Sequence, residues 1–115
     1  MARLDKRTFT YEEALDTLPA VRHWTAAAVR QIEALINQVR SREEAADRKE
    51  EIEEAVNSII QSWVEEVTAI GCQVKGLWLV DWDSGFGYYC WQYPEESIAF
   101  FHSYDEGFEG RVPIN

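Results

Sequence analysis

Apolar residues in the first 70 positions recur at spacings of three and four, the period of a helix that buries one face. Between two such stripes, Ser41 and Glu44 are spaced as a capping box. We therefore expect helices over about 18–40 and 44–70, packed as an antiparallel hairpin with coiled-coil-like geometry. One unbroken helix over 18–70 is the alternative. The two stripes are Leu18, Val21, Trp24, Ala28, Ile32, Leu35 and Val39, then Ile52, Val56, Ile59, Trp63, Val67 and Ile70.

The start of the helical region contains two helix-capping signals. Thr10 and Glu13 form a capping box, which predicts a short helix over about 11–16. Thr17 can cap a second helix, with Pro19 in its first turn, where a missing N–H costs nothing. The pattern therefore predicts a short N-terminal helix before the hairpin.

After Gly71, a natural helix terminator, the hydrophobic period changes from about 3.6 to two. Residues 74–82, 86–93 and 98–103 are predicted strands, joined by turns rich in Asp, Ser, Gly and Pro. A tail over 103–114 follows.

These elements predict an α+β fold, in which a long antiparallel helical hairpin, with a short N-terminal helix, packs on a three-stranded antiparallel β-meander. The chain is long enough for one domain. We assign 1–115 to it, with the hairpin in about 11–71 and the meander and C-terminal tail in about 72–115.

The predicted sheet is apolar on both faces. A three-residue first loop sets Trp82 opposite Phe86, and a four-residue second loop sets Tyr93 opposite Ile98. One face then carries Leu77, Leu79, Tyr89, Trp91, Ile98, Phe100 and His102, and the other Trp78, Val80, Trp82, Phe86, Tyr88, Cys90, Ala99 and Phe101.

An antiparallel sheet usually keeps one face in water, and the helical hairpin can cover only one of these two. The remaining aromatic surface predicts self-association, most simply as a homodimer. The alternatives are that the tail and first helix cover it, or that a ligand or an unidentified protein partner does. The interface candidates are Trp78, Trp82, Phe86, Tyr88 and Phe101.

The charge of the chain argues against nucleic acid as its partner. The net charge is -10, and Lys75 and Arg111 are the only basic residues after position 71, so the aromatic region lacks the basic groove of a nucleic-acid binder. No run of about 20 apolar residues predicts a membrane span. The charged N-terminus does not resemble a secretory signal, so we expect a cytoplasmic protein. Cys72 and Cys90 are then expected to be reduced thiols.

Polar side chains gather at one end of the predicted sheet. Asp81, His102, Asp105, Glu106 and Arg111 are the candidate ligand-binding residues. A histidine with carboxylates suits Fe, Mn or Zn, with His102 and Asp105 as metal candidates. No diagnostic spacing is present, and Asp81 and His102 are expected to lie about 10 Å apart, two strand spacings. No cofactor is predicted; a divalent metal is the alternative to ion pairs made by Arg111.

Cys90 lies in the middle of a predicted strand, where cysteines are usually inert core residues. A nucleophilic cysteine needs a neighbouring base and exposure. In the predicted register His102 points to the opposite face of the sheet. We therefore do not expect catalysis by Cys90, and no catalytic residue is assigned.

Five segments together resemble one family. FTYEEALDTLPAVR, VKGLWLVDW, YYCW, IAFFH and DEGFEGRVPI are similar to the bacterial domain of unknown function 2203 family. The chain departs from that pattern at Pro94-Glu95 and at Trp82. The resemblance implies a small cytoplasmic protein without an assigned activity, and it supplies no catalytic residues. The residues that fall on the pattern are Asp81, Cys90, Trp91, Glu96, His102, Asp105, Gly107, Phe108, Gly110 and Arg111.

Three functional hypotheses follow. The first is a non-enzymatic homo-oligomeric structural or interaction protein, supported by the aromatic excess. The second is a metal- or small-ligand-binding protein, or an enzyme, with its site at the polar end of the sheet. The third is an adaptor whose acidic helical hairpin binds a basic partner.

Overall fold

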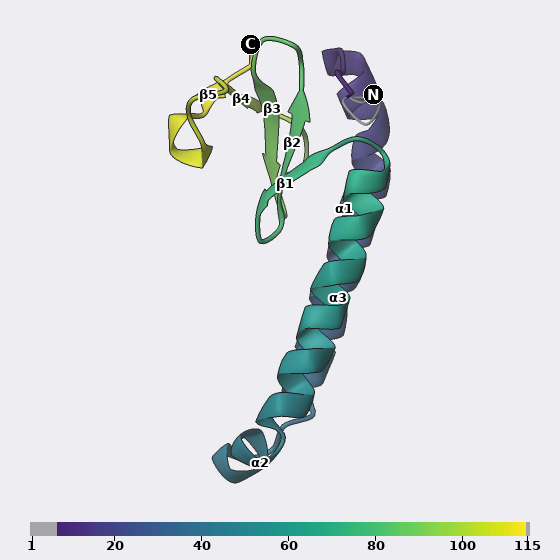
Figure 1. The fold of residues 1–115 in the computed structure, drawn as a ribbon, viewed down its shortest axis with the longest axis vertical. Coiled ribbons are helices and arrows are strands. Elements are labelled where there is room, and N and C mark those ends of the chain that lie inside the picture. Colours follow the sequence, from purple (N-terminus) through teal and green to yellow (C-terminus); the bar gives the residue numbers. More distant parts are fainter. Residues whose placement is uncertain (1–6, 115) are drawn as a thin grey trace, which may run out of the picture.

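A computed structural model describes residues 7–114 and has an α+β architecture. Three helices precede an antiparallel sheet of strand order β1-β2-β3-β4-β5. Helices α1 and α3 run side by side past the end of the sheet, and α2 lies at their far end (Figure 1). No helix within 7–114 is long and apolar enough to cross a membrane. The elements are α1 Tyr11–Asn37, α2 Arg42–Asp47, α3 Lys49–Ala69, β1 Gln73–Gly76, β2 Leu79–Asp83, β3 Tyr88–Gln92, β4 Phe100–His102, the 3-10 helix η2 Phe108–Gly110 and β5 Val112–Pro113.

Helix α1 is continuous where the sequence predicts a break. The capping box is confirmed, since Thr10 accepts from the Glu13 amide and Glu13 accepts from the Thr10 amide. Thr17, however, donates its hydroxyl to the Ala14 carbonyl at 2.8 Å instead of capping a new helix. Pro19 is accommodated inside the helix. The separate helix over 11–16 is therefore wrong, because packing of this stretch onto the core outweighs the local stop signal.

The helical pair is confirmed, with a more segmented turn than predicted. The Ser41 hydroxyl accepts from the Glu44 amide at 3.0 Å and caps the short α2. The Glu44 carboxylate, however, accepts from the backbone amide of Arg40 and not from that of Ser41, so the capping box is incomplete. Arg48 departs from helical geometry and separates α2 from α3. Gly71 follows α3 with a φ of 101°, a conformation that favours glycine. The unbroken helix over 18–70 is wrong.

The sheet has five strands, not three. The predicted strand over 74–82 folds back on itself, because Trp78 adopts a φ of 60° and turns the chain. Strand β1 therefore pairs with β2. At the other end of the sheet, the predicted tail supplies β5, which pairs with β4.

The strand register differs from the predicted one at both hairpins. Asp81 lies opposite Cys90 and Asp83 opposite Tyr88, so the first loop has four residues, 84–87. Its ends are joined by the Ser84 amide, which donates to the Gly87 carbonyl at 2.8 Å. The β2–β3 register is thus shifted by three residues, and the β3–β4 register by one. Odd shifts exchange the two faces of a strand, so the predicted faces are mixed.

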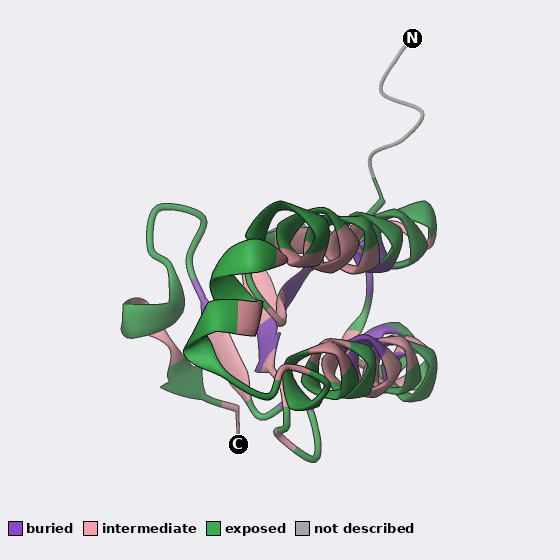
Figure 2. Ribbon diagram, turned by 90° about the horizontal axis from the view of Figure 1, so that it is seen from below, coloured by how far each residue is buried: buried purple, intermediate pink, exposed green. Residues whose placement is uncertain are grey.

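Only one face of the sheet is an apolar core. Figure 2 shows the two long helices on one side of the sheet, with buried residues between them. Trp82 is completely buried in that core and donates its indole N–H to Thr17, which removes it from the interface candidates. Trp78 packs edge-on against Trp63. The core contains Phe9, Ala14, Leu18, Val21, Ala28, Trp63, Val67, Cys72, Val80, Trp82, Trp91 and Ile98.

The other face is polar at its centre. Asp81, Cys90 and His102 lie on it and are buried. The C-terminal segment covers part of this face, where Arg111 stacks over the rings of Phe100 and Phe108, 4.1 Å from each centroid. The prediction that both faces are apolar is therefore wrong. Among the remaining interface candidates Tyr88 and Phe101 are half-buried, and only Phe86, in the β2–β3 loop, is largely exposed, at 88%.

Candidate metal centre

Three strands bring an aspartate, a cysteine and a histidine together on the face of the sheet away from the helices. Asp81 is in β2, Cys90 lies opposite it in β3, and His102 is in β4. Their carboxylate oxygen, thiol sulfur and imidazole nitrogen all lie within 4.8 Å of one another. The three residues are 0%, 0% and 3% exposed. This Asp–Cys–His cluster is therefore sealed from water in the conformation described.

His102 bonds to an acceptor on each side of its ring. Its Nδ1 lies 2.9 Å from the Ser103 carbonyl, and its Nε2 lies 2.9 Å from Oδ2 of Asp81. A carbonyl can only accept, so Nδ1 carries a proton. An ionised carboxylate also only accepts, so a second proton lies between Nε2 and Oδ2. The imidazole and the carboxylate thus share this second proton, and the pair carries no net charge.

The predicted separation of about 10 Å between Asp81 and His102 is wrong for their side chains. Two strand spacings separate β2 from β4 in the backbone. Both side chains lean over Cys90, the small residue between them on β3, and meet there. The corrected register places all three on one face.

Lys75 supplies a second cation. The pairing of β1 with β2 is irregular between Val74 and Gly76, which leaves Lys75 as the extra residue of a β-bulge. Its ammonium lies 3.4 Å from Oδ2 of Asp81 and 3.7 Å from the centroid of the Tyr88 ring. The Lys75 side chain is 35% exposed, so it connects the buried cluster with solvent.

The other carboxylate oxygen of Asp81 is not satisfied. Oδ1 is buried and has no hydrogen-bond partner among the residues described. Leaving a buried acceptor unpaired costs about 1–3 kcal/mol, and more when the group is charged. Such an atom in a cluster of metal-ligand side chains indicates a place for a further positive group.

The Cys90 thiol holds its proton firmly. Burial, and then the negative charge of Asp81, raise the pKa of Cys90 to about 12, although the charge of Arg111 acts in the opposite direction. A nucleophilic cysteine needs the reverse, a lowered pKa and an exposed sulfur. The cluster therefore does not resemble a Cys–His nucleophile.

The model of the family described as "Uncharacterized conserved protein (DUF2203)" matches residues 7–114. The chain belongs to the DUF2203 family. No curated protein and no solved structure matches it.

The residues predicted for the site of this DUF2203 chain divide into two groups. Asp81 and His102 lie together in the cluster. Arg111 pairs instead with Glu95, at 3.0 Å. Asp105 and Glu106 are exposed in the segment after β4 and are not part of the cluster.

Cys90 and Lys75 were missed as members of the site. Strand alternation with the correct register would have placed Cys90 on the same face as Asp81. For Lys75 the only sequence signal is the Lys75-Gly76 step within an otherwise apolar run, which is weak evidence for a bulge and a turn.

Proposed function

We propose that this protein binds a divalent transition metal through Asp81, Cys90 and His102, and that Zn²⁺ fits the ligands best. The convergence of these three side chains around an unpaired, buried carboxylate oxygen supports the proposal. Carboxylate oxygen, imidazole nitrogen and thiolate sulfur are the ligand types that zinc takes in proteins. A thiolate makes the set softer than Mg²⁺ or Ca²⁺ prefers.

The distances are close to those of a tetrahedral site. Metal–ligand bonds of about 2.0–2.3 Å in tetrahedral geometry place neighbouring ligand atoms roughly 3.3–3.6 Å apart. Nε2 of His102 and Oδ2 of Asp81 are 2.9 Å apart, and all three ligand atoms lie within 4.8 Å. A bound ion requires the first two atoms to separate by about 0.4 Å and the sulfur to move toward them. Side-chain rotation can supply such shifts without movement of the strands.

Charge balance also favours a dication. Before binding, the Asp81–His102 pair with its shared proton and the Cys90 thiol together carry no net charge. With a metal bound, a carboxylate, a neutral imidazole, a thiolate and a dication again sum to zero. One dication therefore replaces two protons without changing the net charge that is buried. Binding thus avoids the free-energy cost of burying an unpaired charge.

The Lys75 ammonium competes with a metal ion for the Asp81 carboxylate. This ammonium lies 3.4 Å from the same Oδ2 that would coordinate the metal, and the Lys75 side chain is partly exposed to solvent. Lys75→Met keeps the stem over Tyr88 and removes the like charge. We expect this variant to bind Zn²⁺ more tightly than the wild type. Lys49→Met, at the start of α3, is the matched control and should leave binding unchanged.

The test is a titration of chelator-stripped protein with Zn²⁺, and with Co²⁺ as a spectroscopic probe. We expect one ion per chain, a cobalt–thiolate absorption band and two protons released per ion. Zn²⁺ at 100 times its Kd should add about 2.7 kcal/mol to the free energy of unfolding.

A matched pair of variants locates the ligands. Cys90→Ala should abolish the cobalt–thiolate band, whereas Cys72→Ala, at the other buried cysteine, should retain it. Failure to bind one ion per chain, or loss of the band in Cys72→Ala alone, would overturn the proposal.

A further inference from the structure

Aromatic side chains gather around the start of α1, on the helix side of the sheet. Tyr89 in β3 pairs with Phe101 in β4, and strand alternation points both away from the Asp–Cys–His cluster. The ring centroid of Tyr89 lies 5.4 Å from that of Tyr11 and 5.7 Å from that of Phe101. The ring planes are inclined by 52° and 65°, so the three rings form an angled wall and not a parallel stack.

This aromatic wall is one side of a pocket of about 460 Å³, a volume typical of small-ligand sites. The segment 8–10 forms another side, held in place because the Phe9 amide donates to the Asp83 carbonyl at 2.7 Å. Gly87 lets the Phe101 ring pack closely, since a Cβ at position 87 would lie 2.5 Å from that ring. The lining consists of Thr8, Phe9, Thr10, Tyr11, Glu13, Ser84, Phe86, Tyr89 and Phe101.

A hydrogen-bonded loop presents one further ring, that of Phe86, to this pocket. The Asp83 carboxylate accepts from the Gly85 amide at 2.8 Å, and the Ser84 hydroxyl accepts from the Phe86 amide at 3.1 Å. The Phe86 side chain is nevertheless 88% exposed. The loop therefore holds an aromatic ring beside the pocket without burying that ring in the core.

The charge in this pocket is negative. Glu13 is the only charged residue among the described residues that line it. The capping box holds the carboxylate in place, since its Oε1 accepts from the Thr10 amide at 2.9 Å, and the carboxylate offsets the positive end of the α1 dipole. Arg7 stacks over the Phe9 ring at 4.1 Å. Its guanidinium donates to the Ile70 carbonyl at the end of α3 and is not in the lining.

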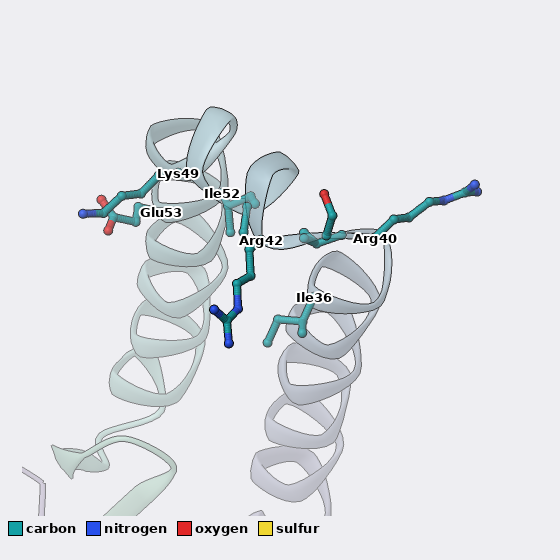
Figure 3. A pocket seen from close by; sticks show the side chains of 9 residues that line it. Ile36, Arg40, Arg42, Lys49, Ile52 and Glu53 are labelled. Atoms are coloured by element: carbon teal, nitrogen blue, oxygen red, sulfur yellow. The ribbon is translucent and has the colours of Figure 1, made fainter.

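A larger groove, of about 640 Å³, lies at the opposite end of the helical pair and has different chemistry. Arg40, Arg42 and Lys49 line it together with one carboxylate, that of Glu53, and the described lining contains no aromatic ring. Figure 3 shows Arg42 in the space between the two long helices. This groove therefore repels a cation, and it serves as an internal reference for the pocket at the start of α1.

We infer that the pocket between the start of α1 and the β2–β3 loop binds the quaternary ammonium group of an organic cation. Such a group has no N–H to donate, and its charge is spread over methyl groups that pack on aromatic rings. The rings attract the cation, and Glu13 supplies the opposite charge. An anion would be repelled by the same carboxylate. No residue of the Asp–Cys–His cluster lines the pocket, so this inference is independent of metal binding.

The test is an NMR titration of the full chain with choline, following the backbone amides. We expect saturable binding with a Kd of about 1–10 mM, since a few partly exposed cation–π contacts support only weak affinity. The largest shifts should fall within 84–87, while Ile36 and Arg42 at the reference groove stay unshifted. The neutral analogue 3,3-dimethylbutanol has the same shape without the charge and should bind roughly tenfold more weakly.

A peptide containing trimethyllysine separates two sources of the same chemical group. Tighter binding of this peptide than of choline would assign the pocket to a modified protein side chain. Equal or weaker binding would assign it to a free small molecule. Both results support recognition of a quaternary ammonium group.

Two variants remove the attraction while preserving the fold. Glu13→Gln keeps the capping box, because glutamine makes the same bond, and Phe86→Leu keeps an apolar side chain without the ring. Each should weaken choline binding roughly 2–5-fold. Glu12→Gln changes a carboxylate in the same helical turn that does not line the pocket, and it should retain the wild-type affinity.

Three results would overturn the inference. The first is the absence of saturable binding of choline and of the peptide up to about 50 mM. The second is equal affinity for choline and for 3,3-dimethylbutanol. The third is an affinity for choline that neither Glu13→Gln nor Phe86→Leu lowers below that of Glu12→Gln.

Discussion

The Asp81–His102 pair can be tested by removing the histidine from metal-free protein. His102→Leu keeps an apolar side chain against the Tyr88 ring, whose centroid lies 5.4 Å from that of His102. It removes the donor that lies 2.9 Å from Oδ2 of Asp81. The carboxylate, which is completely buried, is then left with Lys75 at 3.4 Å as its remaining partner.

Breaking a buried ion pair by removing one partner typically costs about 3–5 kcal/mol. We expect the lower end, about 3 kcal/mol, because the Lys75 ammonium still compensates part of the charge. For a chain of this length that loss lowers Tm by roughly 12 °C, at about 4 °C per kcal/mol. Adding Asp81→Asn to His102→Leu removes the stranded charge and should recover about 1–2 kcal/mol, since an unpaired amide costs less than an unpaired carboxylate.

The assay is urea unfolding followed by tryptophan fluorescence, with a chelator present throughout. Asp81→Asn should lower stability in the wild-type background and raise it in the His102→Leu background. Packing defects alone do not produce that change of sign. The reasoning fails if His102→Leu costs less than about 1 kcal/mol, or if the second substitution lowers stability further.

Three further predictions concern the core and the thiols. Thr25→Val should cost about 1–3 kcal/mol in urea unfolding, because the buried Trp63 indole N–H donates to the Thr25 hydroxyl at 2.8 Å and would lose its partner. The control is Thr68→Val, which removes a hydroxyl-to-carbonyl hydrogen bond on an exposed face and should change stability by less than about 0.5 kcal/mol. Equal effects of the two substitutions would contradict this role of Thr25. Burial raises the pKa of Cys72 and of Cys90 to about 12, from an ordinary thiol value of 9.0. Alkylation of native, metal-free protein at pH 8 should therefore be roughly 1,000-fold slower than after denaturation and accelerate as pH rises; rapid native labelling would refute it. Zn²⁺ affinity should fall by roughly 100-fold for each pH unit of acidification, because two protons compete with each ion, and a pH-independent affinity would exclude the proposed exchange.

The helical half was largely predictable because its determinants are local. The capping box of Thr10 and Glu13, the two apolar stripes and the stop at Gly71 all act over a few residues. The exception is Thr17-Leu18-Pro19, which has the form of a helix start but lies inside α1. Leu18 and Val21 are buried against the sheet, and that long-range packing is not contained in the local pattern.

The sheet was harder to predict because its register depends on loop lengths. The first loop spans 84–87 instead of the predicted 83–85, and this longer, later loop shifts the β2–β3 register by three residues, which changes the facing partners and the face of the sheet that they occupy. The prediction therefore placed His102 and Cys90 on opposite faces, whereas the structure brings them within 4.8 Å. The positions of Asp81 and His102 at one end of the predicted sheet identified them as candidates; only the register identifies Cys90 as their neighbour.

The position of Lys75 connects the irregular part of the fold to the chemistry of the cluster. A regular strand over 74–82 would carry Lys75 away from Asp81, since six residues of extended chain span about 20 Å. The turn at Trp78, held by a positive φ and by packing on Trp63, folds the chain back, and the bulge aims the ammonium at Oδ2. Positive φ in a bulky residue costs about 1–3 kcal/mol, so the surrounding structure must supply that energy. The structural consequence of this turn and bulge is a partly exposed cation beside a buried carboxylate. That arrangement is expected if Lys75 protects Asp81 in the metal-free protein and is displaced when an ion enters.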